Sequence, residues 1–305
     1  MIAAIAMKIY YTDHYVLPLP PGHRFPMRKY SELRDRVTQA PWLMADMLHE
    51  PRAATDAELS RAHCADYVSR VQSGELDSKA MRRIGFPWTP EMVERSRRSS
   101  GATIEACFAA LDEGCGVNLA GGTHHAFYDF GEGFCVFNDS IVAARALLAS
   151  GRVKRVGIID CDVHQGNGTA AIARDDAGIF TFSMHSANNF PFRKETSDMD
   201  IELGDGTVDE DYLQALARGV AETLERAKPD FIIYLAGADP HEGDRLGRLK
   251  LTQDGLAARD EFVLTTLRRK DTPVAVTMAG GYGKVISDTV DIHLRTVELA
   301  VQFFA

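Results

Sequence analysis

Short apolar runs alternate with amphipathic stretches along this chain from about residue 100 onward. Runs rich in β-branched residues predict buried strands at 116–120, 155–161, 179–184, 231–235 and 274–277. Helical periodicity predicts helices at 103–111, 138–149, 209–228, 252–269 and 287–304. The helix at 209–228 is the clearest, because acidic residues lie in its first turn, basic residues lie in its last, and a proline follows.

The first hundred residues are less regular. They predict a strand at 5–11, helices at 28–37 and 56–71, and at 84–90 an apolar loop with two prolines, suited to form a rim or a gate. Strands that alternate with amphipathic helices imply a mostly parallel sheet covered on both faces. Because no linker divides the pattern, we predict a single three-layer α/β/α domain over residues 1–305.

The composition is that of an ordinary globular protein, with 45% hydrophobic and 25% charged residues. A net charge of -9 and the lack of any Lys/Arg run argue against a nucleic-acid surface, while a mild acidic excess is compatible with a cationic substrate. The apolar run at the start is too short for a secretion signal, and no stretch approaches the roughly 20 residues of a membrane span. Five scattered cysteines without a C-x-x-C pair favour reduced thiols and a cytoplasmic location.

Polar or glycine-rich residues follow five of the predicted strands. They are GGTHH (121–125), DCDVH (160–164), SMH (183–185), GADP (237–240) and AGGYG (279–283). The carboxyl ends of parallel strands meet at one edge of a sheet, where ligands bind. We therefore expect these five segments to form one site.

Asp162, His164 and Asp239 are the residues best suited to hold a divalent cation. Asp160, Asp162 and His164 are spaced two apart, so a strand that stayed extended would point all three side chains to one face. Three protein ligands leave room for water and substrate, as in catalytic sites. This ligand set suits Zn²⁺, with Fe²⁺, Co²⁺ or Mn²⁺ as alternatives, and water bound to such a cation ionises near pH ~7.

The adjacent histidines His124 and His125 suit proton transfer to and from a reacting group. Asp160 is a natural orienting partner for one imidazole and Asn167 for the other. Tyr282 follows two glycines, and its phenol is suited to donate a hydrogen bond to a developing oxyanion.

Two aromatic residues in glycine- or proline-containing segments are candidates for the walls of a narrow apolar tunnel. Phe134 lies in GEGFCVFND and Phe190 lies in NNFPF.

These segments resemble the histone deacetylase superfamily, which includes bacterial relatives and the acetylpolyamine amidohydrolases. The matching segments are GGTHHA, GFCVFND, IIDCDVHQGNGT, SMH, GADPHEGDRLG and AGGYG, with GHRFPMRKY nearer the N-terminus. They are most similar to the class IV branch and its bacterial cousins. The resemblance implies the arginase–deacetylase fold, with an eight-stranded parallel sheet.

The resemblance also implies roles for individual residues. The metal ligands would be Asp162, His164 and Asp239, and the catalytic residues His124, His125 and Tyr282. The acyl-lysine tunnel would be lined by Gly133, Phe134 and Phe190. A structural K⁺ would lie against Asp160, Asp162, His164, Ser183 and Met184. The implied activity is zinc-dependent removal of an acyl group, acetyl first, from an acyl-lysine peptide or a small N-acyl amine.

Two departures from class I deacetylases are visible. Asn167 stands where class I has an acid, and the segment Gly85-Phe86-Pro87-Trp88 contains no aspartate to grip a peptide backbone. The alternatives are a long-chain acyl-lysine hydrolase, an acetylpolyamine deacetylase, a two-manganese ureohydrolase and a non-catalytic acyl-lysine binder. The substrate, the acyl length, the native metal and the oligomeric state stay open at this point.

Overall fold

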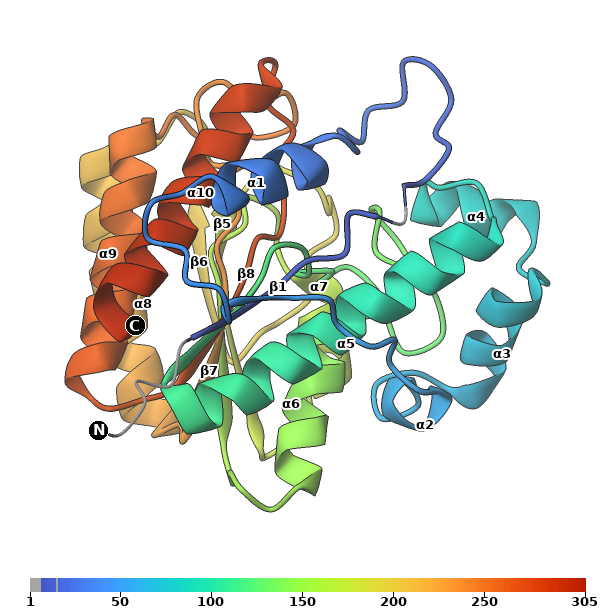
Figure 1. The fold of residues 1–305 in the computed structure, drawn as a ribbon, viewed down its shortest axis with the longest axis horizontal. Helices are drawn as coiled ribbons and strands as arrows, with labels where there is room; N and C mark the ends of the chain where they lie inside the picture. Colours follow the sequence, from blue (N-terminus) through green and yellow to red (C-terminus); the bar gives the residue numbers. More distant parts are fainter. Residues whose placement is uncertain (1–6, 15) are drawn as a thin grey trace.

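A computed structural model describes residues 7–14 and 16–305, and its centre is one eight-stranded sheet (Figure 1). Every strand pair in the sheet is parallel, and the strand order is β2-β1-β3-β8-β7-β4-β5-β6. The strands are β1 (Lys8–Tyr10), β2 (Leu48–His49), β3 (Cys115–Asn118), β4 (Val156–Asp160), β5 (Ile179–Ser186), β6 (Met199–Leu203), β7 (Phe231–Leu235) and β8 (Val274–Thr277).

Helices cover both faces of the sheet (Figure 1). One layer holds α5 (Pro90–Glu113), α6 (Asp139–Ala149) and α7 (Asn167–Ala173), with α2 (Asp56–Leu59), α3 (Ala65–Ser73) and α4 (Ser78–Ile84) beside it. The other holds α1 (Lys29–Thr38), α8 (Asp209–Ala227), α9 (Gln253–Arg269) and α10 (Ile286–Phe304). The predicted three-layer α/β/α class is confirmed.

Strand β7 shows why the central strands are apolar throughout. Phe231, Ile233 and Leu235 belong to the hydrophobic cluster on one face, and Ile232 and Tyr234 belong to the cluster on the other. Alternate side chains of a strand point to opposite faces, so a strand covered on both sides needs apolar residues at every position.

Several predicted elements differ from the observed ones. The predicted helix at 103–111 is the end of the much longer α5, which begins at Pro90 because the Thr89 side chain caps it and proline is favoured at the first position. The predicted helix at 56–71 is two helices, and the sulfur of Cys64 caps the second. Within the predicted strand at 5–11, residues 5 and 6 lie outside the described part, and β1 occupies Lys8–Tyr10.

Four short or polar elements were not predicted: β2, α4, β6 and α7. Edge strand β6 has the sequence MDIEL and is only partly buried, so it lacks the apolar run that marks the inner strands. Strand β2 has two residues and carries no periodicity.

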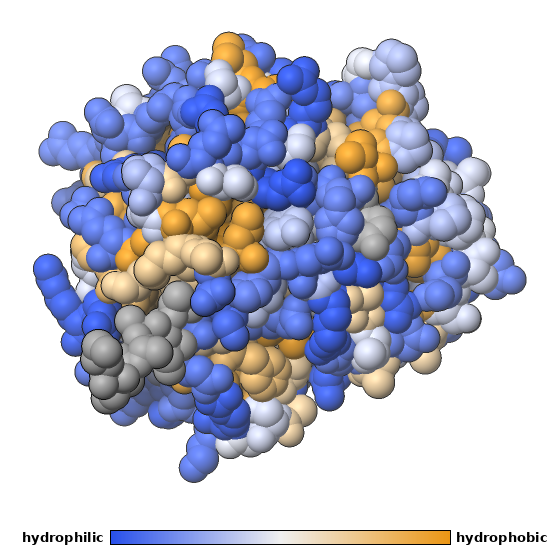
Figure 2. All heavy atoms as spheres, in the orientation of Figure 1, coloured by the Kyte–Doolittle hydropathy of each residue, from blue (hydrophilic) through white to orange (hydrophobic). Residues whose placement is uncertain are grey.

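The face seen in Figure 1 is mostly hydrophilic, with hydrophobic residues in small separate areas (Figure 2). Among the described helices, none combines the length and the apolar character needed to cross a membrane.

Candidate active site

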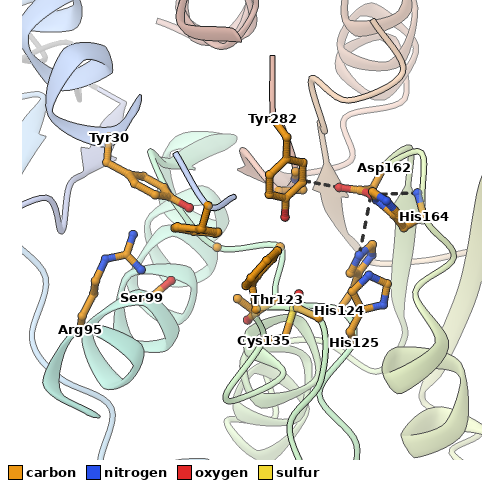
Figure 3. A pocket seen from close by; sticks show the side chains of 17 residues that line it. Tyr30, Arg95, Ser99, Thr123, His124, His125, Cys135, Asp162, His164 and Tyr282 are labelled. Carbon is orange, nitrogen blue, oxygen red and sulfur yellow. Dashed lines mark hydrogen bonds and ion pairs between the residues drawn. The ribbon is translucent and has the colours of Figure 1, made fainter. Parts of the chain in front are cut away.

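Three of the five segments, GGTHH, DCDVH and AGGYG, line one cavity (Figure 3). GADP adds Asp239 through its contact with His164, and no residue of SMH lines the cavity. The GGTHH segment is held by Asp139, the first residue of α6, whose carboxylate accepts hydrogen bonds from the backbone N–H groups of Gly122 (3.0 Å) and Thr123 (2.7 Å). Asp139 is fully buried. A buried carboxylate needs several donors, and here they fix the loop that carries His124 and His125.

Asp162, His164 and Asp239 form a cluster that is able to hold a metal ion. One ligand atom from each lies within 4.8 Å of the others, and all three residues are buried. The Nδ1 atom of His164 lies 2.9 Å from Oδ1 of Asp162 and 3.2 Å from Oδ2 of Asp239. That second oxygen makes no hydrogen bond although it is buried. Two buried carboxylates that converge on one imidazole, one of them with an unsatisfied oxygen, fit a divalent cation.

The chain does not bring these ligands together as an extended strand, so that part of the prediction is wrong. β4 ends at Asp160, and the backbone then bends at 162–164. The Asp160 side chain accepts a hydrogen bond from Asp162 N (3.1 Å), and Asp162 accepts one from His164 N (2.9 Å). Aspartate side chains compete with the sheet for backbone donors, which ends the strand and curls the ligands toward Asp239.

The ionisation of the cluster also favours a cation. Burial alone would lower the pKa of His164, but its contacts with Asp162 and Asp239 raise that pKa to about 10. Burial and the nearby Asp162 raise the pKa of Asp239. The raised pKa of His164 shows strong negative potential at this point, where a metal ion would displace the imidazole proton.

His124 and His125 lie side by side, with ring centroids 4.1 Å apart, yet their partners differ. His124 Nδ1 lies 2.7 Å from the carboxylate of Asp160, and His125 Nδ1 lies 2.7 Å from the amide oxygen of Asn167. Burial would lower the pKa of His124, but Asp160 and Asp162 raise it to about 9. Burial and the neighbouring His124 and His164 hold the pKa of His125 well below its usual value.

Tyr282 lies against the same cavity, opposite the histidine pair (Figure 3). Its backbone N–H donates to Asp244 (2.6 Å). The buried ammonium of Lys29 donates to the carbonyls of Ala279 (3.2 Å) and Gly281 (3.3 Å). Helix α1 therefore anchors the loop at 279–283, which carries Tyr282. Burial and the charges of Asp162 and Asp239 raise the pKa of the phenol well above 10.0, which keeps the hydroxyl protonated.

The three residues expected to line the tunnel border the entrance to this cavity. The Phe190 ring packs edge-on against His125 at 5.0 Å, and the Phe134 ring lies 5.9 Å from that of Tyr282. Gly133 has φ +57°, and a Cβ there would lie 2.7 Å from the His125 ring. Only glycine leaves room for the imidazole at this point.

In the loop at 84–90, Ile84 and Gly85 line the entrance, but the two aromatic residues do not. Phe86 is buried against Phe25 with rings 4.9 Å apart, and Trp88 donates its indole N–H to the carbonyl of Val71 (2.8 Å). The expected apolar gate is therefore wrong for both aromatic residues, because each packs inward. Arg82 and Arg83, at the end of α4, line the entrance in their place.

A small inner cavity of about 40 Å³ extends past the histidines toward α5 (Figure 3). Arg95 of α5 lines its far end, where its guanidinium lies over the Tyr30 ring at 4.4 Å. Arg95 is buried, and its Nε and Nη2 atoms have no hydrogen-bond partner within the described residues.

The residues expected around a monovalent cation are all buried, and two of them, Asp162 and His164, also belong to the cluster. Ser183 of β5 lies opposite Asp160 of β4 in the strand register, and its hydroxyl lies 3.0 Å from His185 Nδ1. Met184 follows it in the strand.

Sequence reasoning missed Asp139, Asp244, Lys29 and Arg95 as parts of this site. The first two lie in the quoted segments GFCVFND and GADPHEGD, and Lys29 lies in GHRFPMRKY, so the segments pointed to them without giving their roles. Nothing in the local pattern marks Arg95, which lies on a long helix.

A model of the histone deacetylase domain matches residues 23–297. This chain belongs to the histone deacetylase family. The family is one of hydrolases, and a deacetylase or amidohydrolase activity is supported by its named members.

Curated relatives agree with this assignment. The chain is 44% identical to an uncharacterized protein of a Picosynechococcus species, over 95% of this chain and 96% of that protein. It is 29% identical to histone deacetylase 2 of Arabidopsis thaliana, over 88% of this chain and 73% of that one. It is 32% identical to a histone deacetylase-like amidohydrolase of Pseudomonas aeruginosa, over 76% of this chain and 65% of that one.

A solved structure gives the same fold. The HDA15 HD domain superposes with a TM-score of 0.81 over 96% of this chain and 90% of the other, at 21% identity. At that identity the likeness speaks for the fold alone.

Proposed function

We propose that this protein is a zinc-dependent deacylase that removes an acetyl group from the side chain of an acyl-lysine. The observation that carries the proposal is the convergence of three kinds of group on one cavity. These are the candidate metal ligands Asp162, His164 and Asp239, the histidine pair, and the Tyr282 hydroxyl. A Zn²⁺ ion bound by the three ligands would supply a Lewis acid for the amide carbonyl and for the attacking water. We also propose a structural K⁺ beside Asp160, Asp162, His164, Ser183 and Met184.

We assign the role of general base to His125. Asn167 Nδ2 donates to Glu132 (3.3 Å), which leaves the Asn167 oxygen to accept from His125 Nδ1. A carboxylate only accepts, so Glu132 supports this orientation of the amide. His125 therefore carries its proton on Nδ1 and keeps a lone pair on Nε2. Its lowered pKa keeps it neutral and able to take a proton from water.

His124 suits the opposite task. Its Nδ1 faces the Asp160 carboxylate, which together with Asp162 raises the pKa to about 9 and favours the cationic form at neutral pH. A cationic imidazole beside the reacting carbon stabilises negative charge and is placed to favour protonation of the leaving amine. Two adjacent histidines thus divide acid and base functions through their different partners.

Tyr282 is assigned to the oxyanion that develops on the amide carbonyl. Its phenol stays protonated because the pKa is raised, and the loop that carries it is fixed by Asp244 and Lys29. A fixed donor aimed at developing charge costs little reorganisation during the reaction.

The size of the inner cavity favours a short acyl group. Its volume is about 40 Å³, and a cavity needs roughly 10–15 Å³ to hold one water. An acetyl methyl fits such a space, while a fatty chain requires its walls to move.

The proposal is tested on peptides of one sequence that carry acetyl-, octanoyl- or myristoyl-lysine, beside N-acetylputrescine. We expect zinc-loaded protein to release acetate fastest, a chelator to stop the release, and added Zn²⁺ to restore it. Faster release of octanoate would overturn the assignment of acetyl. Failure to cleave any member with metal bound would overturn the catalytic proposal and favour an acyl-lysine binder.

A further inference from the structure

The entrance to the candidate active site is a cavity of about 540 Å³ that reaches His125, His164 and Tyr282. Its walls come from the end of α4, the segment before α1, and the loops at 188–192 and 246–248. Any substrate whose amide reaches the histidines must leave the rest of its structure in this entrance.

The charged side chains that line the entrance are nearly all positive. Four arginines line it, Arg24, Arg82, Arg83 and Arg248, against the single acid Glu132. The chain as a whole carries a net charge of -9. The positive lining is therefore a local feature, opposite in sign to the rest of the molecule.

Two of these arginines have no acidic partner among the residues that the structure describes. Arg24 and Arg82 are exposed and enter no ion pair within the described ranges. Arg83 lies over the Phe130 ring at 4.4 Å and reaches Glu132 only at 3.9 Å, so this pair is loose. Arg248 pairs with Asp205 at 3.2 Å.

The wall behind Arg24 adds a further positive charge. Arg245 donates through Nη2 to the carbonyl of Arg24 (3.1 Å) and through Nε to the carbonyl of Tyr282 (2.9 Å). Its guanidinium thus bridges the rim and the loop that carries Tyr282, and no carboxylate of the described residues pairs with it. Unpaired guanidinium groups at a concave opening attract anions and repel cations.

We propose that the entrance selects substrates with negative charge next to the acylated amine: acyl-lysine peptides flanked by aspartate or glutamate. This inference rests on the proposed deacylase function and specifies its substrate class. Carboxylates beside the acyl-lysine form exposed ion pairs with Arg24 and Arg82. Each pair stabilises the complex only modestly, but together the charges speed the association of a negatively charged peptide. An acetylpolyamine carries positive charge at the same place and is repelled. The positive entrance thus disfavours a cationic substrate, although the net charge of -9 is compatible with one.

The test uses three acetyl-lysine peptides of equal length, flanked by glutamate, glutamine or arginine, and N-acetylspermidine. We expect kcat/KM to be about tenfold higher for the glutamate peptide than for the glutamine peptide, with the arginine peptide and the polyamine lowest. The difference should shrink at high ionic strength, because salt screens exposed charges. The double variant Arg24→Gln, Arg82→Gln should lose most of the preference. Arg218→Gln, an exposed arginine of α8 on the other layer, should keep it.

The outcomes separate the inference from the proposed function. Equal cleavage of all three peptides would overturn the charge selection and leave the deacylase standing. If no peptide is cleaved, the deacylase proposal falls, and fluorescence anisotropy of the labelled peptides decides the inference by itself. Tighter binding of the glutamate peptide, weakened in the double variant, would support it, and equal binding of the three would overturn it.

Discussion

The Nδ1 atom of His124 lies 2.7 Å from a carboxylate oxygen of Asp160, inside the protein and directly behind the candidate metal cluster. The next residue in the chain, His125, faces an amide. This difference of one formal charge between the two partners contributes to the separation of the pKa values of the adjacent imidazoles. It gives one site both a cation and a neutral base, as the proposed hydrolysis requires.

Replacement of Asp160 should damage catalysis more than metal binding. In Asp160→Asn the shape is kept but the negative charge that holds the His124 proton is lost, so the pKa of His124 should fall. We expect kcat to drop by about a hundredfold or more. Steady-state kinetics on an acetyl-lysine peptide, with zinc content measured on the same samples, provides the check. Unchanged kcat would show that the charge of His124 has no part in the reaction.

Tyr282→Phe should remove a donor and little else. The phenol makes no other hydrogen bond within the described residues, and the ring would keep its contacts with Phe25 and Phe134. Loss of an oxyanion donor typically costs about 10²–10³ in kcat. We expect that loss with the melting temperature and the zinc content preserved, as measured by calorimetry and elemental analysis. A variant with wild-type turnover would remove Tyr282 from the mechanism.

Gly280→Ala should block metal binding. A Cβ at this position would overlap Asp239 Oδ2 and lie 2.5 Å from Asp162 Oδ2. We expect the variant to retain far less zinc after dialysis than the parent protein. Gly204→Ala is the matched control, because a Cβ there meets nothing within 4 Å and the position has no positive φ. Equal zinc in the two variants would argue against the assigned cluster.

His63 should make stability depend on pH. It accepts from Asn138 N (2.9 Å), and its Nδ1 lies 2.8 Å from the Phe127 carbonyl, so it is needed neutral. Burial lowers its pKa to about 4 from 6.5. Between pH 6.5 and about 4, His63 binds a proton in the unfolded chain but not in the folded chain. The free energy of unfolding therefore decreases as the pH falls, by roughly 3 kcal/mol across this window.

Urea unfolding between pH 6.5 and 4 checks this contribution. His63→Gln should be less stable than the parent protein at neutral pH, because the buried hydrogen bonds change. Its stability should fall less steeply as the pH is lowered. Parallel curves for the two proteins would mean that His63 does not titrate as its burial requires.

The parts of the fold that the sequence predicted are those with a strong local signal. The strand Phe231–Leu235 is apolar at every position, and the ends of α8 carry charges that suit its dipole. Strand β6 was missed because its neighbour β5, rather than its own composition, makes it a strand. An edge strand pairs with a neighbour on one side only, and here that pairing overrides the weak strand propensity of the sequence.

The site could be predicted where the chemistry is local and not where it depends on distant residues. Asp162 and His164 stand two residues apart, and their residue types alone suggested a metal. Their geometry could not be predicted in the same way. The bends between them depend on aspartate side chains that accept hydrogen bonds from backbone N–H groups. Lys29 meets the carbonyls of Ala279 and Gly281 across 250 and 252 residues of chain, a contact that no local pattern can reveal.

The most direct test of the proposed deacylase is a zinc titration of the metal-free protein, with acetate release from an acetyl-lysine peptide as the readout. We expect activity to rise linearly and to stop rising at about one Zn²⁺ per chain, because one three-ligand cluster is found among the described residues. A plateau near two ions would favour the binuclear ureohydrolase alternative. Acetate release that is the same with and without bound metal would contradict the central claim.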